Sequence, residues 1–385
     1  MLLALNHKEP DRVPLGELGI DSPITEKALR RKTFYRAKWR EWTAIWQGGR
    51  DEVVESQKKD MVDLVRRFEW DFVTVHLVPS KYKIYKKPKF LEKYTWEDEE
   101  GRVWKYSPLS EGWPICIKQR EIGLKDLKES SPSELEPDES ELELVRYVVR
   151  ELGETHFILG RTGDGSFWRN PFIFGPGGER TFIDVGSFES YLMKMITNPE
   201  FIFKATQIGV KQAIATSTAL LEAGCDGVIA TADYCSSQGS LMSPEHFRKF
   251  VYPALKKHCD AVHHKGGYFI KHTDGNTWPI LEMMVEAGID GYQGIQLNAG
   301  MDMRKLREKY GNKICLFGGV DCDTLIKGSR EDVKKEVEYA IKYAASGGGL
   351  VITSGNTVTA GTKYENYIDM LETTKERGRY PVSFD

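Results

Sequence analysis

The sequence predicts an α/β protein, a TIM (β/α)8 barrel with an N-terminal extension and a hairpin/helix insertion between strands 2 and 3. Short apolar runs rich in β-branched residues recur along the chain, and helix-like stretches separate them. Polar or glycine-rich residues follow each run, where a hairpin protein would have a tight turn. There are eight such runs, which is the number of strands that closes this barrel.

The expected strands are spread over a chain that is long enough for one large barrel, and we expect a single domain over residues 1–385. In chain order the strands are 13–17, 71–75, 157–160, 227–230, 268–272, 291–294, 314–317 and 350–353. Two of them follow near-identical phrases, residues 222–227 and 286–291, which combine a helix end, a glycine stop and a strand entry. We interpret this echo as one βα unit used twice.

Helices are expected between the strands. Their predicted ranges are 199–222, 244–264, 278–286, 303–310 and 331–345. Ser243 before Pro244 and Ser329 before Arg330 are typical helix starts, because a serine side chain caps free N–H groups and proline fits the first turn.

The interval between the second and third strands, about residues 80–155, is much longer than a crossover needs. Residues 93–96 and 103–106 flank an acidic turn and predict a β-hairpin, and a helix-forming segment follows at 131–149. We expect this insertion to lie over the mouth of the barrel. The N-terminal third is rich in tryptophan, and core or lid packing is the expected role of Trp39, Trp42, Trp46 and Trp70.

Composition excludes several classes of function. The 54 basic and 57 acidic residues give a net charge of -3, which offers no electrostatic case for a nucleic-acid partner. The apolar start is too short for a signal peptide, and no run approaches the roughly 18 apolar residues of a membrane span, so we expect a cytoplasmic protein. The six cysteines lack CxxC spacing, which predicts reduced, mostly buried thiols rather than disulfides or a cysteine zinc ribbon.

Ligands of a parallel barrel bind at the carboxyl ends of its strands, so the residues that follow each predicted strand are candidate site residues. These residues are mostly polar, and buried polar groups are costly unless they are satisfied, so the set predicts a solvated, ligand-binding mouth. In chain order they are Glu17, His76, Arg161, Asp164, Asp233, Tyr234, Gln238, His272, Asp274, Asn276, Gln293, Gln296, Asp321 and Asn356.

Some of these residues have a simpler structural interpretation. Asp321 is equally typical of a helix cap, and Gln293 and Gln296 are more typical of loop anchors. Asp233 follows an apolar run, where a carboxylate must find a cation, a proton or backbone donors, and this favours a function. His272 stands at a strand end with a carboxylate two residues later, which also favours a function.

The pair His272 and Asp274 leaves two chemistries open. Side chains two residues apart on an extended segment point the same way, so both can face the barrel axis. They could bind a divalent metal such as zinc, with Glu17 or Asp233 completing the site. They could equally form a histidine oriented by a carboxylate for acid/base catalysis. The glycine-rich segments 175–178 and 347–349 are expected to be turns, because neither has a phosphate-loop pattern.

Several phrases resemble the uroporphyrinogen decarboxylase superfamily over nearly the whole chain. They include Glu-Pro-Asp-Arg-Val-Pro at 9–14, Lys-His-Thr-Asp-Gly-Asn at 271–276 and Gly-Gly-Val-Asp at 318–321, with further matches at 223–227, 243–245, 347–350 and 365–366. The resemblance implies a TIM barrel and one of two chemistries. One is cofactor-free decarboxylation of a tetrapyrrole, and the other is zinc-dependent methyl transfer to or from a corrinoid protein or a thiol.

The sequence departs from the decarboxylase pattern. Those enzymes carry an arginine-rich phrase soon after the first strand, where this chain has the acidic segment 16–21, and a histidine after the last strand, where it has Asn356. Without compensating arginines, Glu17, Asp21, Asp233 and Asp274 would repel a polyanionic substrate. We therefore expect no true uroporphyrinogen decarboxylase activity.

The sequence also departs from the thiol methyltransferases, which bind zinc through a His-x-Cys pair and a later cysteine. His272 matches the histidine, but Asp274 and Asn356 stand at the cysteine positions, which makes the predicted site rich in oxygen. This resembles the methyltransferase components of O-demethylases, which pass a methyl group from a methoxylated compound to a separate corrinoid protein. The resemblance implies a corrinoid protein as partner and aromatic residues such as Tyr234 and Trp278 beside the substrate.

The leading hypothesis is thus a methyltransferase. Its expected catalytic residues are His272, Asp233 and Asp274, and His272, Asp274 and Glu17 are the expected ligands of a possible zinc ion. The expected substrate-binding residues are Glu17, Tyr234, Gln238, Asn276, Gln293, Asp321 and Asn356. Two alternatives stay open: a lyase or decarboxylase that acts on a smaller acid with Asp233 and His272 in proton transfer, and a non-catalytic binding barrel. A homodimer is the default expectation for the assembly.

Overall fold

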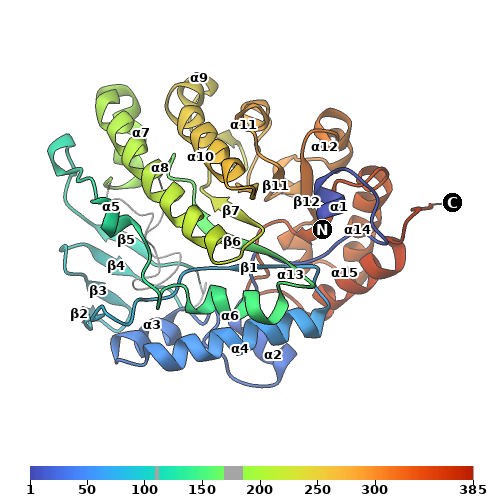
Figure 1. The fold of residues 1–385 in the computed structure, drawn as a ribbon, viewed down its shortest axis with the longest axis horizontal. Helices are drawn as coiled ribbons and strands as arrows, with labels where there is room; N and C mark the ends of the chain where they lie inside the picture. The colour runs from blue at the N-terminus through green and yellow to red at the C-terminus, as the bar shows by residue number, and fades with distance from the viewer. Residues whose placement is uncertain (109–111, 169–184, 385) are drawn as a thin grey trace.

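A computed structural model of the protein describes residues 1–108, 112–168 and 185–384, and its centre is a curled parallel sheet (Figure 1). Seven strands pair in the order β1-β6-β7-β10-β11-β12-β13. They are β1 Phe72–Val75, β6 Phe157–Gly163, β7 Gly227–Thr231, β10 Tyr268–His272, β11 Gly291–Gln293, β12 Cys315–Val320 and β13 Leu350–Ser354. Each lies at a predicted strand, and β6 and β12 extend about three residues further than expected.

The first predicted strand closes the barrel. Leu15 forms a parallel bridge with Ile352 of β13, and Gly16 forms one with Phe72 of β1. Backbone hydrogen bonds join Ile352 N to Pro14 O at 2.9 Å and Asp71 N to Leu15 O at 2.7 Å. The segment 13–17 therefore lies between the two edge strands, and the TIM-barrel prediction is confirmed.

Helices surround this sheet and follow its strands along the chain (Figure 1). They are α1 Leu2–Leu5, α2 Ser22–Leu29, α3 Trp39–Trp46, α4 Arg50–Phe68, α5 Pro132–Leu135, α6 Glu143–Leu152, α7 Phe188–Thr197, α8 Pro199–Glu222, α9 Pro244–His246, α10 Tyr252–His264, α11 Leu281–Ala287, α12 Met303–Tyr310, α13 Cys322–Lys327, α14 Arg330–Ala344 and α15 Tyr364–Arg377. Turns of 3-10 helix cover Leu124–Asp126 and Leu297–Ala299.

Two predicted helices differ from the observed ones for reasons that involve proline. The expected helix over 131–149 is divided into α5 and α6, and α6 continues to Leu152; Pro137 follows α5, and the residue before a proline disfavours the helical conformation. The range 244–264 is helical, but a π-helical turn, Phe247–Val251, joins α9 to α10 next to Pro253. The helix expected over 278–286 begins only at Leu281.

The predicted serine caps are present. The Ser243 hydroxyl accepts a hydrogen bond from the N–H of His246 at 3.1 Å, and the Ser329 hydroxyl accepts one from Asp332 at 3.2 Å. Residues 347–349 form a turn in which all three glycines have positive φ, as expected. The other glycine-rich segment, 175–178, lies outside the described residues.

Side-chain alternation along the strands divides the core into two layers. The inner layer fills the barrel and includes Phe72, Leu159, Ile229, Ile270 and Phe317. The outer layer lies between strands and helices and contains their neighbours along the chain, such as Val73, Ile158, Val228 and Phe269. A residue at the carboxyl end of a strand therefore faces the barrel mouth only if it lies an even number of positions from the inner-layer residues of the same strand.

Three aspartates align neighbouring strands at the opposite, amino end of the barrel. Asp71, Asp226 and Asp290 each precede a strand, and their carboxylates accept the N–H of Leu15 at 2.8 Å, Ile158 at 2.7 Å and Phe269 at 2.6 Å, respectively. The last two aspartates belong to the echoed phrases at 222–227 and 286–291. The echo therefore repeats a contact that ties a new strand to the strand before it.

The insertion forms a separate antiparallel sheet beside α3, at the end of the molecule away from both termini (Figure 1). Its strands are β2 Lys89–Glu92, β3 Thr95–Glu97, β4 Val103–Lys105 and β5 Ile115–Lys118, and β3 and β4 form the predicted hairpin. Trp42 of α3 is buried against Trp96, Trp104 and Tyr106 of this sheet. Packing is thus the role of most N-terminal tryptophans, as expected.

Two further expectations concern the cysteines and the membrane. All six cysteines carry free thiols, and four of them are buried, as predicted. No helix within the described ranges is both long enough and apolar enough to cross a membrane.

Candidate active site

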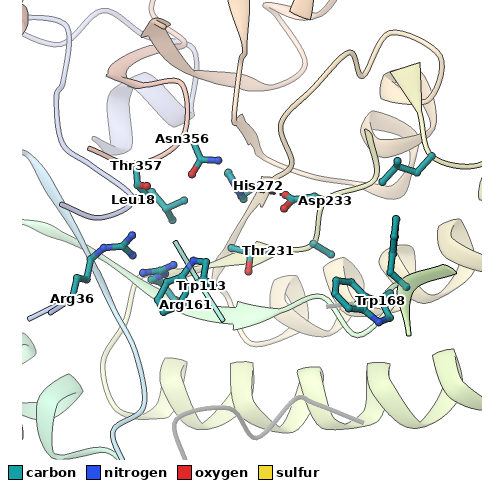
Figure 2. A pocket seen from close by; sticks show the side chains of 13 residues that line it. Leu18, Arg36, Trp113, Arg161, Trp168, Thr231, Asp233, His272, Asn356 and Thr357 are labelled. Atoms are coloured by element: carbon teal, nitrogen blue, oxygen red, sulfur yellow. Dashed lines mark ion pairs between the residues drawn. The ribbon is translucent and has the colours of Figure 1, made fainter. Parts of the chain in front are cut away.

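A cavity of about 390 Å³ opens at the carboxyl ends of the barrel strands, where parallel α/β proteins bind their ligands (Figure 2). Four of the strand-end candidates line it: Arg161, Asp233, His272 and Asn356. Its aromatic wall consists of Trp113, Trp168 and Phe188. Trp113 comes from the insertion, which therefore reaches over the barrel mouth as expected.

His272 ends β10, and its neighbours fix which ring nitrogen carries the proton. The Gln293 amide donates its N–H groups to the backbone carbonyls of Ser354 and Asn356, at 3.2 Å each. Because carbonyls only accept, Gln293 Oε1 must face His272 Nδ1, which donates to it. The lone pair of the neutral imidazole therefore lies on Nε2. Burial lowers the pKa of His272, which favours this neutral form.

Two carboxylates flank the His272 ring. Asp233 Oδ1 lies 3.7 Å from Nε2, and the Asp233 side chain is 58% exposed. Asp274 Oδ2 accepts a hydrogen bond of 2.7 Å from Asn356 Nδ2. Burial, and next the charge of Asp233, raise the pKa of Asp274. The structure thus brings together the three expected catalytic residues as a neutral base, an exposed carboxylate and a carboxyl group that keeps its proton to higher pH.

A second cavity of about 350 Å³ adjoins the first and shares Arg36, Trp113, Asn356 and Thr357 with it. Its further walls are polar and include Asp274, Gln296, Asn298 and Asp321. Asp321 caps α13 by accepting the Asp323 N–H at 2.8 Å, and Gln296 accepts the Gly275 N–H at 3.0 Å. The structural interpretations of Asp321 and Gln296 are thus confirmed, although both residues also face this cavity.

The mouth contains cations that correct one expectation. Asp21 pairs with Arg36 Nε at 2.9 Å and with Lys38 Nζ at 2.8 Å, and Arg161 lines the first cavity. The expectation that the acidic residues lack compensating arginines is therefore wrong. Arg36 has a φ of 50° in the irregular segment between α2 and α3, where no periodic pattern marks a site residue.

Glu17 and Tyr234 do not face the cavity, because strand alternation turns them to the outer layer. Leu18 lines the cavity, whereas the buried Glu17 accepts the Ser354 N–H at 3.1 Å and the Ser354 hydroxyl at 2.7 Å. Burial raises the pKa of Glu17 to about 8. Tyr234 is fully buried, and its hydroxyl donates to Asp164. Their expected contacts with a substrate are corrected accordingly.

Three more expected residues lie beside the mouth. Gln238 is exposed in the hairpin of β8 (Cys235–Ser236) and β9 (Gly239–Ser240). Asn276 donates its N–H to Ser236 O at 2.8 Å, and Trp278 Nε1 donates to Gly300 O at 3.0 Å. The described residues that line the two cavities include none of these three.

His76 ends β1 in the inner layer and is buried. Burial, followed by the charges of Arg161 and Arg36, lowers its pKa to about 3. His76 is therefore neutral at physiological pH.

The expected zinc ligands do not form a complete set. Within residues 1–108, 112–168 and 185–384, no three His, Cys, Asp or Glu side chains are grouped to hold a metal ion. Glu17 is turned away and bonded to Ser354, so it does not join His272 and Asp274. His272 Nε2 and Asp233 provide two donors, fewer than the three or four protein ligands of typical zinc sites.

Comparison with known proteins places this geometry in a family. The family model for uroporphyrinogen decarboxylase (URO-D) matches residues 181–377, just over half of the chain. The methylcobamide:CoM methyltransferase MtaA of Methanosarcina barkeri is 30% identical over 198 residues, which are 51% of this chain and 55% of that protein. A uroporphyrinogen decarboxylase of Trichodesmium erythraeum is 28% identical over 137 residues, 35% of this chain and 37% of the relative.

The matches thus span about half the length of the first relative and less of the second. A solved structure, described as a methyltransferase from Methanosarcina mazei, aligns over 97% of both chains with a TM-score of 0.68 at 20% sequence identity, which shows the shared fold. The barrel, the matched family model and these relatives agree: the chain belongs to the uroporphyrinogen decarboxylase family.

Proposed function

We propose that the protein is a methyltransferase that moves a methyl group from a small methoxylated substrate to the corrinoid of a separate protein. The observation that carries this proposal is the group at the barrel mouth. His272 presents the lone pair of Nε2 beside Asp233, while Asp274 and Asn356 bond to each other where thiol-methylating relatives would place cysteines. An oxygen-rich group that can hold a proton suits an ether oxygen better than a thiol.

The relatives support methyl transfer in general. The name of the Methanosarcina barkeri relative joins a methylcobamide to coenzyme M, so a corrinoid takes part in its reaction. We extend the corrinoid to this chain, but not the thiol, because the resemblance assigns cysteines to the positions that Asp274 and Asn356 occupy.

The proposed reaction needs one proton. The corrinoid of the separate protein would be the acceptor substrate: the methyl carbon–oxygen bond would break, its electron pair would stay on the oxygen, and the methyl group would pass to the reduced cobalt, which would be formally oxidised by two electrons. The oxygen leaves readily only if it is protonated. In this proposal the carboxyl group of Asp274 supplies the proton by way of His272 Nε2, and Asp233, 3.7 Å from Nε2, stabilises the imidazolium that forms on the way.

The first cavity suits a small, flat substrate. Its volume of about 390 Å³ lies near the lower end of the usual range for ligand pockets. Figure 2 shows Arg36, Arg161 and Trp113 near one another, apart from His272, Asp233 and Asn356. The Arg36 guanidinium lies 5.7 Å from the centre of the Trp113 ring, so a ligand here meets an aromatic surface and a cation together.

Zinc is not part of the proposed mechanism, because Glu17 is turned away and the described residues, Asp233 included, group no three donors for a metal ion. Metal analysis of the purified protein tests this point, with the His264→Gln variant as an exposed-histidine control. We expect less than one equivalent of zinc in all forms. A full equivalent that disappears only in His272→Ala would restore the metal hypothesis.

The direct test is methyl transfer from a panel of methoxylated compounds to reduced cobalamin or a reduced corrinoid protein, followed by the loss of Co(I) absorbance. We expect transfer with at least one donor, its loss in His272→Gln and its persistence in His264→Gln. Absence of transfer with every donor and both acceptors would overturn the proposal.

A second candidate function is decarboxylation of a small acid. The two arginines of the cavity favour it, because a guanidinium binds a carboxylate with paired hydrogen bonds. Here the carbon–carbon bond would break, carbon dioxide would leave, and His272 or Asp233 would give a proton to the remaining carbon. Release of carbon dioxide that survives chelation would support this candidate, and no release from any tested acid would remove it.

A further inference from the structure

The residues that alternate with the catalytic group form a buried polar cluster behind it. We call this cluster the backing network: Asp164, Ser166, Tyr234, Lys271 and Thr273. Each of its last three members is a chain neighbour of Asp233, His272 or Asp274, but faces the outer layer instead of the mouth. The reacting side chains and the network are therefore joined through single peptide units.

Lys271 is the centre of this network. Its ammonium has three N–H donors, and three acceptors surround it: Asp164 Oδ2 at 2.8 Å, Ala232 O at 2.9 Å and His272 O at 2.8 Å. Nζ also lies 4.1 Å from the centre of the Tyr234 ring. The side chains of Lys271 and Asp164 are both fully buried.

The two carbonyls bound by Lys271 have a specific place in the chain. One belongs to the residue before Asp233, and the other belongs to His272 itself. They lie at the ends of β7 and β10, where the hydrogen bonds between the two strands come to an end. A single ammonium therefore joins the two backbone segments that present the Asp233 and His272 side chains.

Other members of the network hold the same two segments. The N–H of Tyr234 donates to Thr273 Oγ1 at 3.0 Å, and the Tyr234 hydroxyl donates to Asp164. The Ser166 hydroxyl donates to Asp164 Oδ1 at 2.8 Å. Contacts thus connect the chain on both sides of Asp233 with the chain on both sides of His272.

Stability alone does not account for a buried lysine at this place. Replacing a buried ion pair by apolar side chains of similar volume is often neutral or stabilising, so a pair of this kind is weak evidence for a stabilising role. The acceptors of Lys271 include two carbonyls that flank the reacting side chains. Its geometry therefore points to a role in the site.

We propose that Lys271 is a positioning residue, which sets the separation of Asp233 and His272 across the mouth by tying the ends of β7 and β10 to Asp164. The role rests on the proposed function only in that these two side chains carry the reaction. It applies equally to methyl transfer and to decarboxylation, since both use the same pair.

The first test is the crystal structure of Lys271→Met combined with Asp164→Asn, which removes both charges and leaves none buried without its partner. We expect the distance between His272 Nε2 and Asp233 Oδ1, now 3.7 Å, to exceed about 4 Å, the limit of an ion pair. An unchanged distance would overturn the proposal. This measurement needs no substrate, so it stays informative if methyl transfer fails.

Kinetics provide the second test once a methyl donor is known. The double variant should lose at least about tenfold in kcat with KM changed less than threefold, because the reacting groups and not the binding walls have moved. The matched control is Arg50→Met, whose buried guanidinium also donates to two carbonyls, Pro79 O and Ser140 O, but far from β7 and β10 in the sequence. Equal kcat losses in both would indicate general destabilisation and would overturn the proposal.

A milder variant covers the case in which the double variant does not fold. Tyr234→Phe removes one hydroxyl from the network and keeps the ring beside Lys271. It should lower kcat by a smaller factor in the same direction, and Lys271→Arg, which keeps the charge and the donors, should retain more activity than Lys271→Met. A kcat for Tyr234→Phe equal to that of the wild type would contradict the proposal.

Discussion

Two pairs of a basic residue and a carboxylate, one residue apart on β10, show how the barrel separates structure from chemistry. Lys271 and Asp164 lie 2.8 Å apart with both side chains fully buried, whereas His272 and Asp233 lie 3.7 Å apart with Asp233 58% exposed. The first pair faces the helices, and the second faces the mouth. A strand alternates its side chains, so two adjacent basic residues, a charged lysine and a neutral histidine, serve opposite purposes.

The difference lies in how far each pair is solvated. A closed pair cannot lose one partner without leaving an uncompensated charge in a medium of low dielectric constant. An open pair exchanges protons with solvent and ligand, and its members can change charge at low cost. Mutations of the two pairs should therefore separate into effects on stability and effects on activity.

The largest expected effect is on activity. His272→Gln should lower kcat for methyl transfer by about 10²- to 10⁴-fold, because it removes the group that carries the proton. The midpoint of thermal unfolding should stay close to that of the wild type. A midpoint lowered as strongly as in Lys271→Met would break the comparison between the two pairs.

The next effect is on stability. Lys271→Met alone leaves Asp164 charged and buried, and should lower the free energy of unfolding by about 3–5 kcal/mol in chemical denaturation. Adding Asp164→Asn should restore much of this loss. If the double variant were no more stable than the single one, the buried charge would not be the cause.

Glu17 extends the comparison to a buried carboxyl group that accepts hydrogen bonds from a serine, Ser354. Its pKa of about 8 in the folded state exceeds the value of 4.5 for the unfolded chain, so the folded state keeps a proton that unfolding releases. Its contribution to stability is therefore fully present below about pH 4.5 and is lost as the pH rises toward about 8.

Glu17→Gln should reduce this loss of unfolding free energy, which is on the order of a few kcal/mol. Denaturation curves recorded between about pH 4.5 and about pH 8 measure it. Burial also raises the pKa of Glu41 to about 8, so part of the dependence of unfolding free energy on pH should remain until Glu41→Gln is added. A wild-type slope that persists in the double variant would refute the assignment to these two carboxyl groups.

The smallest expected effect concerns the orientation of His272. Gln293→Leu removes the acceptor of Nδ1 and should lower kcat about tenfold, which corresponds to one lost hydrogen bond. The control is Gln57→Leu, a buried glutamine that donates to Glu41 at 2.9 Å, well outside the mouth. Equal losses in the two variants would assign the effect to packing instead of orientation.

Much of the barrel could be predicted from the sequence because its signals are local. Apolar runs, glycine stops and serine caps act within a few residues, so seven strands and helices such as α8 and α12 occur where expected, and the eighth predicted strand, 13–17, is present as a bridging segment. Asp233, His272 and Asp274 were found together for the same reason, since parallel strands place their carboxyl ends at one edge.

Strand parity explains the main errors. The prediction assigns all strand-end residues to the mouth, although Glu17 and Tyr234 lie at positions whose side chains face the outer layer. Counting from the apolar residues of the same strands, such as Leu15 and Val228, would have separated them from Leu18 and Asp233. This signal was in the sequence.

Other site residues had no such signal. Arg36 and Trp113 lie in irregular segments outside the predicted barrel strands, and they reach the cavity because α3 and the inserted sheet pack together. Their position follows from tertiary packing, which neither periodicity nor local propensity describes. Of the two arginines that line the first cavity, the sequence therefore indicated only Arg161, which follows a predicted strand.

The three aspartates at the amino end of the barrel have a consequence for engineering. Asp71, Asp226 and Asp290 set the register between neighbouring strands from the rim that carries no chemistry. The contacts that align the strands and the candidate catalytic residues therefore lie at opposite ends of the barrel. We therefore expect that loops above His272 can be exchanged between homologues without changing the register of the strands.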